Sequence, residues 1–223
     1  MVTSLSTEQL INYTSRQLNY FYPDDKLVNL NDYKDCVFLA LDRLEFCYSK
    51  VSLKHYFNVE QSIFNHLHSD HYIMYLWFLA NTIWNKTQHK SICNKLYYLN
   101  KTLHGMDCMF DTKLPDIFLI FHGVGTMLGK ATYSDYFVAL QGCTVGNNKG
   151  KYPEMDKGVA LTAHSSIIGD CKVGKLVTIS SYTSIFDMNI EEKQVVFKND
   201  EGKIICKPTL NSFAQSFFNV DII

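Results

Sequence analysis

The sequence of 223 residues predicts an α+β protein in which an α-helical N-terminal half precedes a parallel β-helix and a short C-terminal tail. Two observations predict this fold. Up to about residue 108, apolar residues recur at spacings near 3.6, and beyond Leu114-Pro115 they recur every six residues. We therefore expect a helical domain over residues 1–112, a β-helix over 113–188, and a hairpin and helix tail over 189–223.

Composition indicates a globular protein and argues against several classes of function. Hydrophobic residues make up 47% of the chain and charged residues 19%. The formal charge of −1 offers no basic surface for nucleic acid. Seven scattered cysteines without a Cys-x-x-Cys pair favour a reducing compartment. The start of the chain lacks signal-peptide features and the least polar stretch, 73–84, is too short to span a bilayer, so we expect a cytoplasmic protein.

Helices are expected at four places in the N-terminal half. Ser6 is a plausible start for the first helix, and residues 32–48 place their apolar side chains on one face. Ser69 and Asp70 are expected to cap a third helix that continues to residue 83. A fourth helix is expected over about 91–103. This half is therefore predicted to be a helical bundle or cap.

The six-residue period predicts the β-helix. It is carried by Met155, Leu161, Ile167, Val173, Ile179 and Ile185. Four residues after each of the first five stands a small or β-branched residue: Val159, Ser165, Cys171, Val177 and Thr183. Neither a helix nor an alternating strand generates this pattern, whereas a triangular parallel β-helix does, because each hexapeptide forms one flat face. The alternative is an ordinary β-rich domain with coincidental spacing.

The repeat is less regular toward its start. Ala139 and Val145 stay in register, and four extra residues before Met155 predict a loop over 147–152, where solenoids usually carry function. Between residues 119 and 136 the register slips, so the first coil is expected to be distorted.

Beyond residue 185 the repeat ends. Residues 195–197 and 203–206 flank a turn at 199–202, which predicts a β-hairpin. Residues 210–220 are expected to form a short terminal helix.

Three segments of this repeat resemble a known family. They are His122-Gly-Val-Gly-Thr-Met-Leu-Gly129, Leu140-Gln-Gly-Cys-Thr-Val-Gly146 and Gly158-Val-Ala-Leu-Thr-Ala-His-Ser-Ser-Ile-Ile-Gly169. In this order they resemble the serine acetyltransferase group of hexapeptide acyltransferases, well over residues 117–187 and in outline over the helical half. The resemblance implies a left-handed β-helix and an acetyl-CoA-dependent O-acetyltransferase.

His122 matches the catalytic histidine of that group. A hydroxyl is a poor nucleophile until a base removes its proton, and imidazole has a suitable pKa at neutral pH. Gly123 and Gly125 favour this role, because small neighbours let a substrate approach closely. The alternative is an ordinary histidine at a corner of the β-helix.

The residue before this histidine departs from the family pattern. The serine-specific enzymes have an aspartate there that orients the ring, whereas this chain has Phe121. We expect Asp70 to supply that interaction, with a backbone carbonyl as the alternative. The segment His66-Leu-His68-Ser-Asp70-His71 is alternatively a solvent-exposed cap or a metal site, but no Cys/His pair follows at zinc spacing, so no metal is expected.

The predicted loop carries the second departure. Lys151-Tyr152-Pro153 stands where the serine-specific enzymes have Arg-His-Pro. Tyrosine can bond a hydroxyl or stack on a sugar, but it offers no positive charge to a carboxylate. We therefore expect a sugar or surface-polysaccharide hydroxyl as acceptor, bound by Lys151, Tyr152 and His71. A serine O-acetyltransferase of cysteine biosynthesis, a non-catalytic β-helix scaffold, and Tyr152 as a mere loop anchor are the alternatives.

For acetyl-CoA, the resemblance implies a groove between adjacent subunits of a homotrimer. The matching positions are Gly146, Asn147, Ala163 and Ser181, where small residues let the pantetheine arm lie against the backbone. Lys207 is expected to meet the CoA phosphates, with a solvated lysine as the alternative. The helical half is expected to join trimers into hexamers or to cover the site.

Overall fold

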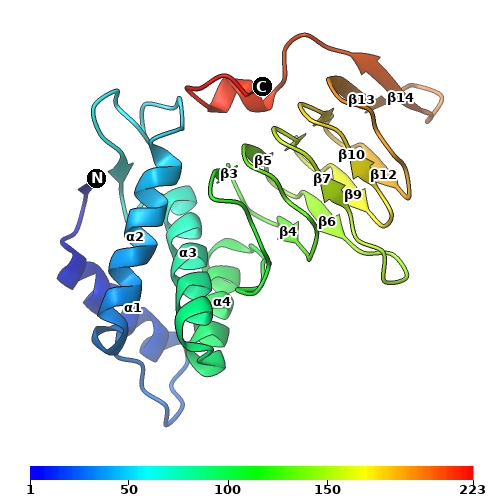
Figure 1. Ribbon diagram of the computed structural model, residues 1–223. Helices are drawn as coiled ribbons and strands as arrows, with labels where there is room; N and C mark the ends of the chain where they lie inside the picture. Colours follow the sequence, from blue (N-terminus) through cyan, green and yellow to red (C-terminus); the bar gives the residue numbers. More distant parts are fainter. Residues whose placement is uncertain (223) are drawn as a thin grey trace.

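The computed structural model describes residues 1–222, and it confirms the helical half followed by a left-handed parallel β-helix (Figure 1). The N-terminal half contains α1 (Thr7–Phe21), α2 (Lys34–Tyr48), α3 (Ser69–Thr87) and α4 (Lys90–His104). A 3-10 turn η1 (Leu30–Tyr33) precedes α2, and two short strands, β1 (Val2–Thr3) and β2 (Ile63–Phe64), pair in parallel.

The helix starts follow two different mechanisms. Helix α1 begins as predicted, because the Ser6 hydroxyl accepts from the N–H of Gln9 while the Gln9 side chain accepts from the N–H of Ser6. The expectation that Ser69 and Asp70 cap α3 is wrong. The N-cap is His68, which makes no capping side-chain bond, and Asp70 lies buried inside the first turn. Its carboxylate is turned toward the β-helix instead.

Helix α3 is the centre of the helical half. Every residue from 70 to 83 is buried, because α3 packs against α2, α4 and the first strand of the β-helix. A helix that is buried on all sides is apolar on all sides, which explains why the segment 73–84 is the least polar of the chain.

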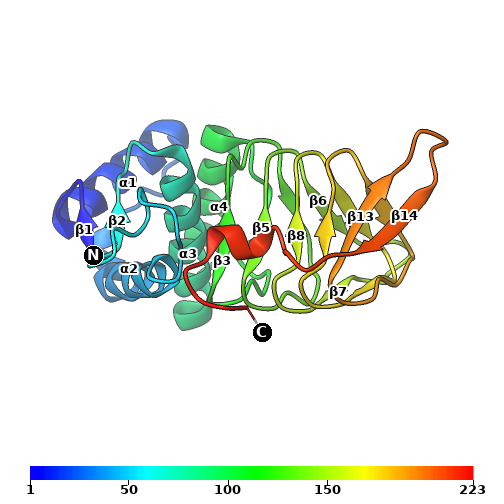
Figure 2. The same cartoon turned by 90° about the horizontal axis from the view of Figure 1, so that it is seen from above.

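The β-helix has three parallel faces, and its coils lie side by side in Figure 2. The first face contains β3 (Phe118–Ile120), β5 (Phe137–Ala139), β8 (Ala160–Leu161) and β11 (Thr178–Ile179). The second contains β4 (Met127–Leu128), β6 (Thr144–Gly146), β9 (Ser166–Ile168) and β12 (Ser184–Phe186). The third contains β7 (Glu154–Met155) and β10 (Lys172–Val173).

Burial confirms the hexapeptide period. The six residues at this spacing from Met155 to Ile185 are at most 3% exposed, and their small partners at most 1%. The loop over 147–152 also leaves the coil as predicted, with Asn148 and Lys151 bonded to each other through both backbone N–H groups. The first coil departs from this period. The separation along the chain between the paired residues Phe118 and Phe137 is one residue more than three hexapeptides, and that between Met127 and Thr144 is one residue less.

The predicted hairpin is formed by β13 (Gln194–Lys198) and β14 (Ile204–Pro208), which pair antiparallel with each other. Strand β13 also pairs in parallel with β11, so the hairpin extends the first face. The chain then returns along the first face to the helical half, as Figure 2 shows. In this tail, the N–H of Phe213 donates to Thr178, and Ser52 donates its N–H to the carbonyl of Phe217 at 2.8 Å. The expected terminal helix is shorter than predicted, a single 3-10 turn η2 (Ala214–Phe217).

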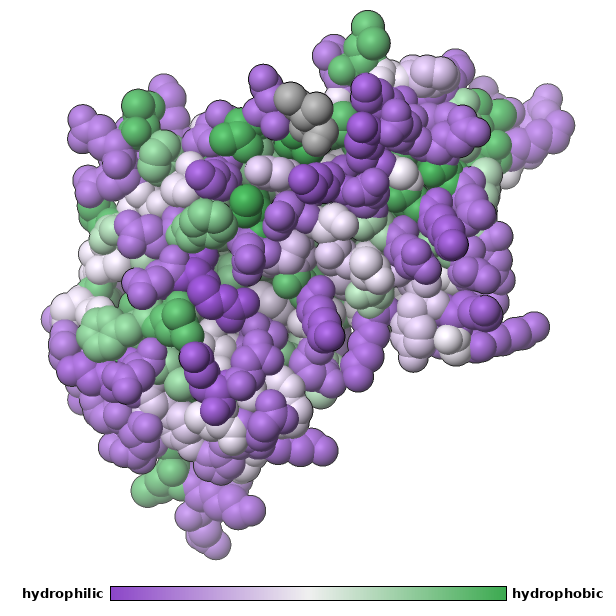
Figure 3. Space-filling view, viewed as in Figure 1, coloured by the Kyte–Doolittle hydropathy of each residue, from purple (hydrophilic) through white to green (hydrophobic). Residues whose placement is uncertain are grey.

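The surface seen in Figure 3 is mainly hydrophilic, with hydrophobic residues scattered in small groups. Within the described part of the chain, none of the helices combines the length and the apolar character that crossing a membrane requires.

Candidate active site

His122 occupies the tight turn between β3 and β4, at one corner of the first coil. Its φ is +55°, and its carbonyl accepts from the N–H of Val124 at 2.8 Å. The left-handed region costs a non-glycine residue on the order of 1 kcal/mol. This conformation presents the imidazole outward, and the side chain is 65% exposed.

Asp70 meets this histidine from the helical half. Its side chain is only 3% exposed, and Oδ2 accepts from the backbone N–H of His122 at 2.9 Å. The same oxygen lies 3.6 Å from Nδ1 of the His122 ring, which is longer than a hydrogen bond. The carboxylate therefore fixes the turn through the backbone and faces the Nδ1 side of the ring, and Nε2 lies on the other side.

Gly123 determines how closely α3 approaches this turn. A Cβ at this position would lie 2.5 Å from Cγ2 of Ile120 and 3.1 Å from Cδ1 of Ile73 on α3. The structure thus gives Gly123 a packing reason in addition to the expected access for substrate. Since Asp70 and Ile73 lie within one turn of α3, the contact at Gly123 also brings the carboxylate to His122.

Phe121, the residue before His122, makes aromatic contacts on two sides. Its ring centroid lies 4.0 Å from that of His122 and 5.4 Å from that of Phe217 in the C-terminal tail. The side chain therefore ties the turn to the tail and supplies no polar partner to the imidazole.

The structure does not bring His71 to a surface where an acceptor could touch it. The side chain is 1% exposed, and its Nδ1 accepts from the N–H of Asn65 at 3.1 Å. Its ring packs between Tyr56, at 4.4 Å, and His68, at 4.2 Å between centroids. Burial, assisted by the neighbouring histidines, lowers the pKa of His71 to about 3.

This burial predicts acid sensitivity of the fold. Between pH 6.5 and about 3 the unfolded chain binds a proton at residue 71 that the folded chain does not, so the free energy of unfolding decreases as the pH falls. The contribution is roughly 1.4 kcal/mol per pH unit. Urea unfolding from pH 7 to pH 4 is expected to show a shallower acid dependence in His71→Phe than in the native protein. An unchanged dependence in His71→Phe would contradict this, and the exposed His89→Phe serves as control.

The loop residues Lys151 and Tyr152 lie at a different corner from His122. The turn of His122 precedes β4, whereas the loop follows β6, the neighbouring parallel strand. The two therefore stand at opposite edges of the second face. Tyr152 is 46% exposed, and Nζ of Lys151 lies 4.0 Å from Asp170. A single chain does not bring these side chains to His122.

The expected acetyl-CoA positions also divide between the corners. Ala163 and Ser181 lie on the corner of His122, where the carbonyl of Ala163 accepts from the N–H of Tyr182 in the next coil. Gly146 and Asn147 lie at the corner of the loop. Lys207 lies on β14, with Nζ 5.2 Å from the ring centroid of Phe197, at the far end of the β-helix.

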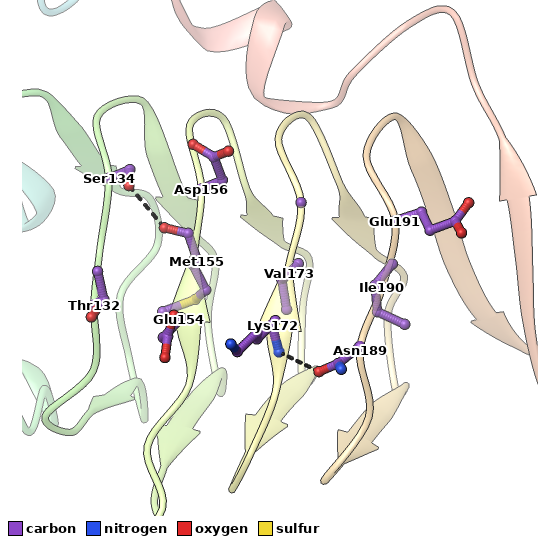
Figure 4. Close-up of a pocket in the computed structure, with 11 residues that line it drawn as sticks. Thr132, Ser134, Glu154, Met155, Asp156, Lys172, Val173, Asn189, Ile190 and Glu191 are labelled. Atoms are coloured by element: carbon purple, nitrogen blue, oxygen red, sulfur yellow. Dashed lines mark hydrogen bonds between the residues drawn. The ribbon is translucent and has the colours of Figure 1, made fainter.

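An open groove of about 620 Å³ follows the third face (Figure 4). In Figure 4 its side chains come from successive coils, and the N–H of Lys172 donates to Asn189. No residue of the His122 turn lines it. Among residues 1–222, no group of three His, Cys, Asp or Glu side chains has an arrangement that could hold a metal ion.

The end of α4, which carries His104, also reaches the corner of His122, although the sequence did not single this residue out. It is the last residue of α4, and a Cβ on the following Gly105 would lie 3.3 Å from the backbone nitrogen of Gly125. A histidine before a helix-ending glycine is common, and no motif distinguishes it, so only the packing of α4 against the turn reveals its position.

Solved structures similar to this chain share one architecture. A serine O-acetyltransferase from Brucella melitensis, described as a bacterial transferase hexapeptide repeat protein, aligns at a TM-score of 0.67 and 17% identity, over 92% of this chain and 86% of its own. A serine acetyltransferase from Vibrio cholerae O1 biovar El Tor aligns at 0.64 and 14%, over 90% and 79%. A serine acetyltransferase in complex with CoA aligns at 0.55 and 16%, over 85% and 73%.

No protein-family model matches the chain. No curated protein matches it. At these identities the structural likeness establishes the fold, and it covers the helical half as well as the coils. The chain therefore has the fold of the serine acetyltransferases, in which a helical half is joined to a β-helix of hexapeptide repeats.

Proposed function

We propose that this protein is an acetyl-CoA-dependent O-acetyltransferase with His122 as general base. The observation that carries the proposal is the pairing of an exposed imidazole with a buried carboxylate, Asp70, at a corner of a β-helix that has the fold of the serine acetyltransferases. A carboxylate facing Nδ1 favours the tautomer with hydrogen on Nδ1, which leaves the lone pair on Nε2 for the substrate.

The reaction would follow from this tautomer. The acceptor hydroxyl attacks the thioester carbonyl of acetyl-CoA while Nε2 of His122 takes its proton. The tetrahedral intermediate then expels the CoA thiolate, which recovers the proton from the imidazolium, and the products are an acetyl ester and CoA. Asp70 stabilises the transient positive charge on the ring. Backbone N–H groups at the corner would stabilise the oxyanion.

The proposed active site is shared between chains. The loop with Lys151 and Tyr152 and the turn of His122 lie at opposite edges of the second face, so they would meet only between two protomers. Exposed apolar side chains line the His122 edge of this face, with Val124 at 68% and Met127 at 49%. These features support the predicted homotrimer, with the helical half available to join two trimers.

For the acceptor we propose a hydroxyl of a sugar or of a surface polysaccharide unit. Tyr152 in the loop can bond or stack on a sugar, whereas the family's arginine and histidine are absent. The alternative acceptor is serine, because the similar structures are named serine acetyltransferases. A cytoplasmic location is part of the proposal and agrees with seven free cysteines.

Thiol release tests the proposal. The protein is incubated with acetyl-CoA and, in turn, N-acetylglucosamine, UDP-N-acetylglucosamine, galactose or L-serine, and free CoA is followed with a thiol reagent. Fastest release with a sugar is expected. Fastest release with L-serine would support the acetyltransferase activity but contradict the sugar as acceptor. No release with any acceptor would favour the non-catalytic scaffold.

A further inference from the structure

His104 is the last residue of α4, close to the turn that carries His122. Its helix, α4, ends against the turn of His122, because Gly105 approaches Gly125 closely and the N–H of Asp107 donates to the carbonyl of Thr126 at 2.9 Å. The ring of His104 packs on Tyr72 of α3, with 6.0 Å between the ring centroids. Helices α3 and α4 and the first coil of the β-helix therefore meet at the corner of His122.

The hydrogen bonds of Asn100 determine the tautomer of His104. The Asn100 side-chain Nδ2 donates to the carbonyl of Ile73 at 3.0 Å, and this carbonyl can only accept. The amide oxygen of Asn100 must then be the atom that faces Nδ1 of His104, at 2.8 Å. An oxygen acceptor requires a hydrogen on Nδ1. In the neutral ring, Nε2 consequently carries the lone pair.

The ring is neutral at physiological pH. Partial burial lowers the pKa of His104 to about 4, and this effect outweighs the smaller, opposite effects of Asn100 and Asp70. No hydrogen bond within residues 1–222 uses Nε2, and the residue is only partly buried. His104 thus has an unused hydrogen-bond acceptor at the end of α4 that approaches the His122 turn.

We propose that His104 is a specificity-determining residue that accepts a hydrogen bond from a second hydroxyl of the acceptor. The inference rests on the proposed function and refines its substrate class. The lone pair of His104 can bond only a hydrogen donor, so this side of the site suits a neutral polyol with neighbouring hydroxyls, as in a sugar ring. Placing the carboxylate of an amino acid here would set like polarity against like.

A site built to bond a substrate hydroxyl rejects analogues that lack it, because its own polar group is then left unpaired. His104 would act on binding of the acceptor and not on the proton transfer at His122. Its removal should therefore raise the KM for the acceptor and leave the KM for acetyl-CoA unchanged.

Kinetics of two variants test this role, with the sugar that turns over fastest among N-acetylglucosamine, UDP-N-acetylglucosamine and galactose. His104→Phe keeps a flat ring and removes the acceptor, and it is expected to raise the acceptor KM about 10-fold. His104→Gln can place an amide oxygen near the position of Nε2, and it should recover most of that loss. His89→Phe, at the other end of α4, is the matched control.

A second measurement is independent of activity. Long-range 1H–15N correlation spectra of the histidine rings report which nitrogen carries hydrogen. We expect the Nδ1–H tautomer for His104 at pH 7.5, lost in Asn100→Leu. A Nε2–H or doubly protonated ring would overturn the inference, as would an acceptor KM in His104→Phe equal to that of His89→Phe.

The outcomes separate the two proposals. If the native protein does not release CoA with any of the acceptors, the proposed function fails, and the proposed specificity for a diol fails with it. If it acts on a sugar and His104→Phe behaves like the control, only the role of His104 fails. Fastest turnover with L-serine would overturn the polyol class while the acetyltransferase stands.

Discussion

Replacing His122 with alanine is expected to lower kcat for acetyl transfer by about 10³-fold, because the attacking hydroxyl loses its general base. The affinity for CoA should stay within about twofold, since the imidazole acts on the acceptor. Steady-state CoA release gives kcat, and calorimetric titration with CoA gives the affinity.

Backbone conformation complicates the alanine variant, and a second substitution resolves this. His122 has φ of +55°, which alanine tolerates poorly and asparagine tolerates well. His122→Asn should be as inactive as His122→Ala and closer to the native thermal stability. His164→Ala is the matched control, because His164 is an exposed imidazole at φ +59° on the same corner, stacked on Tyr182. Equal losses in His164→Ala and His122→Ala would contradict the assignment.

Asp70→Asn is expected to lower kcat by about 10²-fold while the fold persists. The amide oxygen can still accept from the backbone N–H of His122, so the turn remains anchored, but the negative charge that stabilises the imidazolium is lost. Asp70→Ala removes the anchor as well, and we expect a greater loss of activity and a lower melting temperature. Kinetics and thermal unfolding of both variants measure the two effects separately.

Asp35→Asn provides the comparison for a carboxylate in the first turn of a helix. Asp35 occupies the first turn of α2 and is exposed, so its loss changes the helix terminus without touching the site. Its kcat should equal that of the native protein. Full activity in Asp70→Asn would show that His122 acts without the charge of its neighbour.

The coils could be predicted from the sequence because their physics is local. A three-sided coil repeats the same interior environment every six residues, so the spacing alone predicts that Ile167 and Ile179 are buried. The capping box of α1 is equally local, since Ser6 and Gln9 are three residues apart. In both cases the interacting groups are near one another in the chain.

The site could be predicted only in part, because its contacts join distant segments. Asp70 and His122 are 52 residues apart, and their approach depends on how α3 packs on Gly123. Both residues were predicted from the sequence, but we also expected Asp70 to serve as a helix cap. His104 gave no signal, because its tautomer depends on Asn100 and on a carbonyl of another helix. Tertiary packing, which no periodicity encodes, decides these contacts.

Repeat proteins without such a tail can fray coil by coil from an exposed end, because each repeat touches only its neighbours. In this chain, the return of the tail removes that independence. The segment that leaves the last coil bonds Thr178 and packs on Tyr136 through Phe218 and on Phe121 through Phe217. Beyond the end of α2, the N–H of Asn219 donates to the carbonyl of Lys50. Detaching the last coil would disturb the opposite end of the β-helix, so we expect the coils and the turn of His122 to unfold as one cooperative unit.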